Sequence, residues 1–123
     1  PAHQYFLDFD TTNWNPSLDL YGGGGLMSDA EDLGAFTRLL LKGKVLKTEA
    51  MLEQMTGSGT ADYRLGLFCY EFEGRLGWGH SGFWNTFVVH FPTLDLTISG
   101  SVMSHHAIRG MDLVAEVLEL LER

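Results

Sequence analysis

The sequence is poor in cysteine and in basic residues, and it has no long apolar run. Its single cysteine, Cys69, excludes an internal disulfide and a cysteine-based zinc site. Eight Lys and Arg residues stand against sixteen Asp and Glu residues, and the formal net charge is −8. Because binding to phosphates needs a basic face, this charge argues against a nucleic-acid partner. No apolar run approaches the roughly 18 residues of a membrane-spanning helix, so we expect no membrane span.

The length and the hydrophobic content of the sequence suffice for one globular domain. The chain has 123 residues, of which 45% are hydrophobic, and we expect residues 1–123 to form a single domain. A domain of this size buries about two thirds of the surface that its unfolded chain exposes. Residues 1–21 show no sustained period and contain turn-forming residues, which predicts a loop with at most one short extended segment.

Helical periodicity occurs in three places. Ser28 and Glu31 have the spacing of a capping box, and the apolar residues behind them predict a helix over 29–42. A second, short helix is predicted to begin near Thr48 and to end at Gly57. An apolar stripe with acidic residues beside it predicts a third helix over 107–122.

Between the second and third helices the period changes to that of strands. Leu65–Phe72 and Arg75–Trp78 flank Glu73-Gly74, which has the composition of a two-residue hairpin turn. Thr86–Phe91 predicts another strand, and Leu94–Met103 alternates as a half-solvated antiparallel strand does. We therefore expect an α+β fold with an antiparallel sheet of three to four strands. The C-terminal helix should cover one face of this sheet, with helix 29–42 nearby.

The most distinctive stretch is the glycine-rich sequence GWGHSGFWN at residues 77–85, which we expect to form a turn. Its glycines either let the backbone approach another segment closely or adopt positive φ. A His-Ser pair held there has catalytic potential, although the alternative is a hairpin connection whose polar side chains face water. The stretch is not a nucleophile elbow, because Phe83 stands where Gly-x-Ser-x-Gly needs its last glycine and a strand follows the serine.

Two kinds of cofactor site are disfavoured. The four glycines at 22–25 lack the Lys-Ser/Thr of a phosphate-binding loop, and a loop rather than a buried strand precedes them, so close backbone packing is the favoured role. The five histidines lack metal-binding spacings, and the side chains of the adjacent His105 and His106 would diverge on a strand. We interpret His90 as a residue on the surface or on a sheet face. We expect no cofactor and no metal.

A resemblance covers residues ~20–122. The order of YGGGGLMSDAEDL, a helix, a short helix ending in Met, RLGLF, GWGHSGF, two strands and a terminal helix is similar to the C-terminal portion of the serine β-lactamase-like family. That family includes class C β-lactamases, penicillin-binding proteins that act as D-alanyl-D-alanine carboxypeptidases, and esterases. The resemblance implies hydrolysis of a small-molecule or peptide acyl substrate (a β-lactam, a D-alanyl peptide or an ester) through an acyl-serine.

The resemblance implies roles only where residues match. His80-Ser81-Gly82 corresponds to the family's Lys/His-Thr/Ser-Gly motif, whose side chains position substrate and assist proton transfer. The backbone N–H after that glycine, here of Phe83, forms one half of the oxyanion hole in the family. The residues thereby implicated in catalysis are His80, Ser81, Gly82 and Phe83.

Two family motifs are missing. No serine of this sequence has a lysine three residues later, and no Tyr-x-Asn or Ser-x-Asn is present. We therefore expect this chain to be the C-terminal part of such a hydrolase, without its nucleophile segment and inactive alone. The exposed apolar surface of such a part favours a homo-oligomer or a swapped dimer. The alternative function is a non-catalytic binding or interaction module that keeps the sheet half of the fold.

Overall fold

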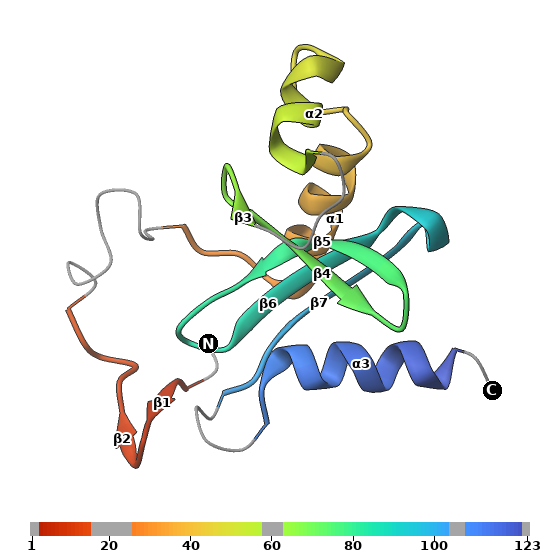
Figure 1. The fold of residues 1–123 in the computed structure, drawn as a ribbon. Coiled ribbons are helices and arrows are strands. Elements are labelled where there is room, and N and C mark those ends of the chain that lie inside the picture. Colours follow the sequence, from red (N-terminus) through yellow and green to blue (C-terminus); the bar gives the residue numbers. More distant parts are fainter. Residues whose placement is uncertain (1–2, 16–25, 58–62, 104–107, 122–123) are drawn as a thin grey trace.

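An antiparallel sheet forms the centre of the computed structural model, which describes residues 3–15, 26–57, 63–103 and 108–121 (Figure 1). Within these residues the sheet has five strands, and their order across the sheet, β3-β4-β5-β6-β7, follows the chain. Each strand therefore pairs with the next one along the sequence. The strands are β3 (Tyr63–Arg64), β4 (Leu67–Phe72), β5 (Arg75–Ser81), β6 (Thr86–Phe91) and β7 (Leu96–Ser101).

Two helices cover the sheet (Figure 1). α1 (Ala30–Leu41) and α3 (Gly110–Leu120) both contact β6 and β7, and they do so from opposite faces. α2 (Glu49–Thr56) follows α1 and contacts β3 and β4. A separate two-stranded hairpin, β1 (Tyr5–Phe6) and β2 (Phe9–Asp10), precedes these elements in the chain.

β6 is buried on both faces, and the main core lies between it and α3. Successive side chains of a strand point to opposite faces, so one set of β6 side chains meets α3, while Val88 and His90 are buried toward α1. The main core consists of Phe87, Val89, Phe91, Val114 and Leu118. A smaller buried cluster consists of Leu67, Cys69 and Trp78.

The structure confirms the α+β class and the turn at Glu73-Gly74, where both residues have positive φ (50° and 79°). The sheet has more strands than the three to four predicted. Leu65 and Gly66 also have positive φ (42° and 90°), so they form a turn rather than the start of a strand, and β3 can pair back on β4. β7 begins later than predicted because Pro92–Leu94 forms a 3-10 turn.

The polar face of β7 is partly solvent-exposed, as the alternation over Leu94–Met103 predicted, with Asp95 and Ser101 exposed and Thr97 and Ser99 partly buried. α1 packs on that face, and the Ser99 hydroxyl donates a hydrogen bond to the Ala30 carbonyl oxygen at 2.6 Å. A Cβ atom at Gly34 would lie 2.8 Å from Ser99 Oγ and 3.8 Å from the Thr97 methyl carbon. Small polar side chains on this face let α1 approach part of it closely, while the rest stays open to water.

The capping box predicted for α1 is wrong. The N-cap is Asp29 rather than Ser28, and its carboxylate accepts a hydrogen bond at 2.8 Å from the backbone N–H of Asp32 rather than Glu31. The inward face of α1 includes Leu40, as the periodicity predicted, but not Phe36, which is 53% exposed.

The other two helices agree better with the sequence. α2 begins after Thr48 and ends at Gly57, as predicted. α3 is shorter than the predicted range 107–122, and the apolar residues Ile108 (46% exposed) and Leu121 (64% exposed) lie beyond its buried stripe. None of the described helices combines the length and the hydrophobicity that a bilayer crossing requires.

The N-terminal region is more ordered than the loop predicted for residues 1–21, because its described part forms the β1–β2 hairpin. The rings of Phe6 and Trp14 lie 6.2 and 6.3 Å from that of Trp84, in edge-to-face geometry. The Gln4 side chain donates a hydrogen bond of 3.1 Å to the Trp84 carbonyl oxygen. These contacts fasten the hairpin to the connection between β5 and β6.

The interpretation of His90 as a surface or sheet-face residue is half right, because it lies on a sheet face but is only 2% exposed. Its Nδ1 atom lies 2.8 Å from Thr97 Oγ1. Burial lowers the pKa of His90, and Lys42 and Arg38 lower it further, whereas Asp95 and a backbone hydrogen bond raise it. The net shift is downward, so the unfolded chain takes up a proton at His90 more readily than the folded chain does.

We therefore predict that acidification destabilises the fold through His90. This group's contribution is complete above about pH 6.5 and is lost as the pH falls toward its lowered pKa. Between about pH 7.5 and 5.5, the free energy of unfolding from urea denaturation should fall more steeply in the wild type than in His90→Gln. His90→Gln changes no other residue, so an equal fall in the two proteins would contradict the prediction.

Candidate active-site wall

The stretch predicted as a glycine-rich turn over residues 77–85 is mostly strand. β5 continues through Gly79 to Ser81, and the connection to β6 occupies only residues 82–85. The serine of the motif therefore has a position fixed by the sheet. It pairs with Phe87 of β6, a residue of the main core.

The glycines of β5 serve close approach between strands. A Cβ atom at Gly79 would lie 1.9 Å from the backbone oxygen of Val88, and one at Gly77 would lie 2.6 Å from a Val89 methyl carbon. Neither glycine adopts the left-handed conformation. Of the two roles left open by the sequence, close backbone approach is the one that Gly77 and Gly79 have.

The connection from β5 to β6 is a tight turn. The backbone N–H of Gly82 donates to the Thr86 carbonyl oxygen (2.8 Å), and the N–H of Asn85 donates to the Gly82 carbonyl oxygen (3.0 Å). Asn85 has φ of 62°, a left-handed conformation that asparagine tolerates better than most residues.

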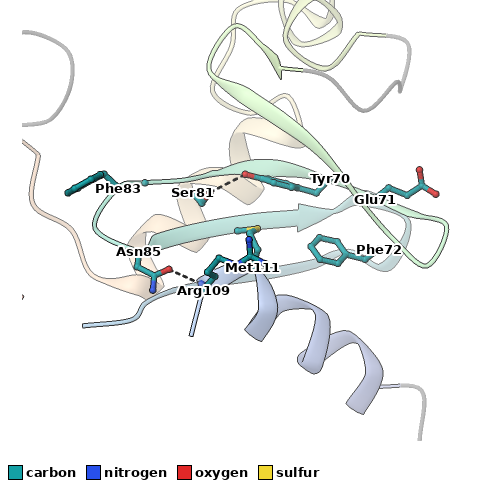
Figure 2. A pocket seen from close by; sticks show the side chains of 10 residues that line it. Tyr70, Glu71, Phe72, Ser81, Phe83, Asn85, Arg109 and Met111 are labelled. Atoms are coloured by element: carbon teal, nitrogen blue, oxygen red, sulfur yellow. Dashed lines mark hydrogen bonds between the residues drawn. The ribbon is translucent and has the colours of Figure 1, made fainter. Parts of the chain in front are cut away.

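A cavity of about 580 Å³ opens on the α3 side of the sheet, where the end of β5 faces β4 and the start of α3 (Figure 2). Three chain segments supply its wall, so it exists only in the folded chain. Its lining residues are Tyr70, Glu71, Phe72, Ser81, Gly82, Phe83, Asn85, Arg109, Gly110 and Met111.

Of the four residues implicated by the sequence, Ser81, Gly82 and Phe83 line this cavity and His80 does not. The Ser81 hydroxyl is half-buried and lies 3.4 Å from the Tyr70 hydroxyl (Figure 2). His80 is exposed, and its ring centroid lies 5.9 Å from that of Tyr63 and 5.2 Å from that of Phe68.

The Phe83 side chain is turned away from the Tyr70–Ser81 pair (Figure 2). Its ring stacks on Phe6 at 5.6 Å and meets Trp84 edge-on at 5.1 Å. The contribution of Phe83 to the cavity wall therefore comes from the turn that carries it, which the N-terminal hairpin supports.

Three residues of this wall, Tyr70, Asn85 and Arg109, were not predicted from the sequence. Tyr70 could have been predicted, because the hairpin turn at residues 73–74 fixes the register that sets Tyr70 opposite Gly77 and so on the same sheet face as Ser81. Asn85 had a weaker signal, an asparagine just before a strand. No sequence signal pointed to Arg109, because its ion pair with Asp112 (3.2 Å) is of an ordinary surface kind.

Two sequence interpretations fall outside the described residues, namely the four glycines at 22–25 and the pair His105-His106. Within the described ranges, no group of three or more His, Cys, Asp or Glu residues is arranged to hold a metal ion.

Comparison with known families identifies the chain. The sequence model of the beta-lactamase family matches residues 2–117, which is nearly the whole chain. The chain therefore belongs to the beta-lactamase family, and the resemblance to serine β-lactamase-like hydrolases is confirmed at that level. No curated protein and no solved structure shows a significant match.

The two glycines around His80-Ser81 should differ sharply in their tolerance of a side chain. Gly79→Ala forces apart the backbones of β5 and β6, and we predict a loss of about 1–3 kcal/mol or more in the free energy of unfolding. Gly82→Ala, whose Cβ would lie 3.8 Å from its nearest neighbour, should change it by no more than about 0.5 kcal/mol. Guanidinium denaturation of both variants tests this, and equal midpoints would contradict it.

Proposed function

We propose that this chain forms one wall of the active site of a serine hydrolase that transfers acyl groups through a serine ester. The observation that carries the proposal is the cavity at the end of β5, lined by Ser81, Gly82 and Phe83 in a chain of the beta-lactamase family. The substrate is a small molecule or peptide with a reactive acyl group, such as a β-lactam, a D-alanyl peptide or an ester.

In this proposal Ser81 positions the substrate and does not attack it. Among the described residues its hydroxyl has a tyrosine hydroxyl as hydrogen-bond partner, Tyr70, and not a lysine, a histidine or a carboxylate. A serine nucleophile needs a neighbouring base to take its proton. The Tyr70–Ser81 pair instead supplies two hydroxyl groups at fixed positions on the wall, which suits orientation of a polar group.

The remaining roles follow the family's motif. We propose that the backbone N–H of Phe83 donates to the developing oxyanion, and the loss of one such donor costs enzymes of this type about 10²–10³-fold in rate. We assign His80, which is exposed at the same strand end, to assistance of proton transfer.

The nucleophile comes from a segment outside these 123 residues. The support is the lack of Ser-x-x-Lys and Tyr-x-Asn in the sequence, because the lysine is what activates the serine in this family. The same lack favours the alternative function, a non-catalytic module that binds a ligand in the cavity. The reading frame upstream of Pro1 distinguishes the two, since a Ser-x-x-Lys followed by Tyr-x-Asn there supports the hydrolase.

A covalent probe tests the hydrolase. We predict that a fluorophosphonate leaves the intact mass of the 123-residue chain unchanged, and that it adds one adduct to a protein that also carries the upstream segment, on the serine of Ser-x-x-Lys. In that longer protein Ser81→Ala should slow labelling about tenfold or more and leave the adduct on the same serine.

The outcomes of this experiment are distinct. An adduct on Ser81 of the 123-residue chain would show that Ser81 is itself the nucleophile and would overturn its assignment as a substrate-positioning hydroxyl. A longer protein that carries Ser-x-x-Lys but takes no label would favour the binding module.

We also propose that the chain alone self-associates. Large apolar side chains are exposed before α1 and in the β3–β4 turn, including Leu26 (96%), Met27 (100%) and Leu65 (66%). We predict a dimer or larger species in sedimentation velocity at high concentration. The longer protein serves as the control, because its additional segment should cover this surface. A chain that sediments as a monomer at every concentration would contradict the prediction.

A further inference from the structure

Asn85 makes hydrogen bonds to three separate parts of the chain. Its backbone N–H bonds within its own turn, and its backbone oxygen accepts from the N–H of Val102, just after β7, at 3.0 Å. Its side-chain amide donates to the Ile108 carbonyl oxygen at 2.7 Å. It also accepts from the Gly110 N–H at 2.7 Å (Figure 2). These partners are 17 to 25 residues away in sequence, so the contacts form only when α3 is seated on the sheet.

The side-chain amide of Asn85 hydrogen-bonds to the residues on both sides of Arg109, an arrangement called here the Asn85 bracket. It binds the carbonyl before Arg109 and the N–H after it, as the backbone of a neighbouring strand would. The Arg109 backbone is accordingly extended (φ −81°, ψ 141°). α3 has no side-chain cap of its own at Arg109. The asparagine therefore satisfies the first N–H group of the helix from a distant turn.

The junction also leaves no free space on its other side. Gly110 is buried, and a Cβ atom there would lie 2.1 Å from the Phe87 ring. The helix start is thus pressed against β6 and fastened to the turn, which fixes two walls of the cavity relative to each other: Ser81–Phe83 on one side, and Arg109–Met111 on the other.

We propose that Asn85 is a positioning residue for acyl transfer, which sets the turn carrying Ser81 and the Phe83 amide against the Arg109 segment. This inference rests on the proposed function. Asn85 acts through these residues, not on the reacting atoms. Asparagine suits the position because it tolerates the left-handed backbone and carries both a donor and an acceptor. Glycine would meet only the first requirement, and aspartate would retain only the acceptor.

The experiment compares Asn85→Gly and Asn85→Asp with Leu118→Ala in the longer protein. Leu118 is 4% exposed and lies on α3, two turns from the cavity, so its truncation weakens the same helix without touching the turn. The first readout is the rate of fluorophosphonate labelling of folded protein. The second is hydrogen exchange of the Gly110 amide in the 123-residue chain.

We expect Asn85→Gly to slow labelling about 10- to 100-fold, because small misplacements of reacting groups cost that much, while Leu118→Ala stays within about twofold of the wild type. Asn85→Gly should also speed exchange at Gly110 more than in the rest of α3. For Asn85→Asp, the labelling rate relative to wild type should rise as the pH is lowered, since a protonated carboxyl can again donate to the Ile108 carbonyl.

The outcomes distinguish failure of the positioning role from failure of the hydrolase. A labelled wild type with equal rates in Asn85→Gly and Leu118→Ala would overturn the positioning role and leave the hydrolase standing. An unlabelled wild type would overturn the hydrolase and the positioning role together. Unchanged exchange at Gly110 in Asn85→Gly would show that the Asn85 bracket does not hold the helix start, which would also overturn the inference.

Discussion

The close pairing of β5 with β6 is the constraint on which the rest of this structure depends. Gly79 carries no side chain, so the backbones of β5 and β6 can approach closely at this position. A Cβ atom on residue 79 would lie only 1.9 Å from the Val88 backbone oxygen. β6 then lies within the sheet with both faces buried, and its residue Phe87 supports Gly110 at the start of α3. The cavity lies where this pairing ends and the turn begins.

The two helices that cover β6 are held by different physical interactions. α3 buries Val114 and Leu118 against the apolar face, an attachment that depends little on pH. α1 lies on a polar face, above His90, and its Arg38 and the adjoining Lys42 hydrogen-bond to Asp95 and lower the pKa of that carboxyl to about 2. Exposed ion pairs of this kind stabilise little.

The cavity wall has the composition of a substrate site with few polar groups at set positions. Aromatic side chains from β4 form its apolar part, and the Tyr70–Ser81 pair supplies two hydroxyl groups. The sheet register fixes these hydroxyl groups, and the hydrogen bonds of the Asn85 amide to residues 108 and 110 hold the turn beside them. The chain belongs to the beta-lactamase family, and the proposed function places this wall at its active site.

The sequence by itself determined the features that depend on neighbouring residues. It predicted the ends of α2 at Thr48 and Gly57, the turn at Glu73-Gly74 and strand Thr86–Phe91, because caps, positive φ and β-branched runs act locally. The resemblance of residues 80–83 to the family's motif also came from the sequence alone, and their catalytic role stays a prediction. Only the tertiary structure decided that α1 covers the polar face of β7 and that the Asn85 amide reaches residues 108 and 110. Those contacts join segments that are distant in sequence. A short polar side chain can contact water, a helix or a backbone amide, and the sequence alone does not say which of these will be its neighbour.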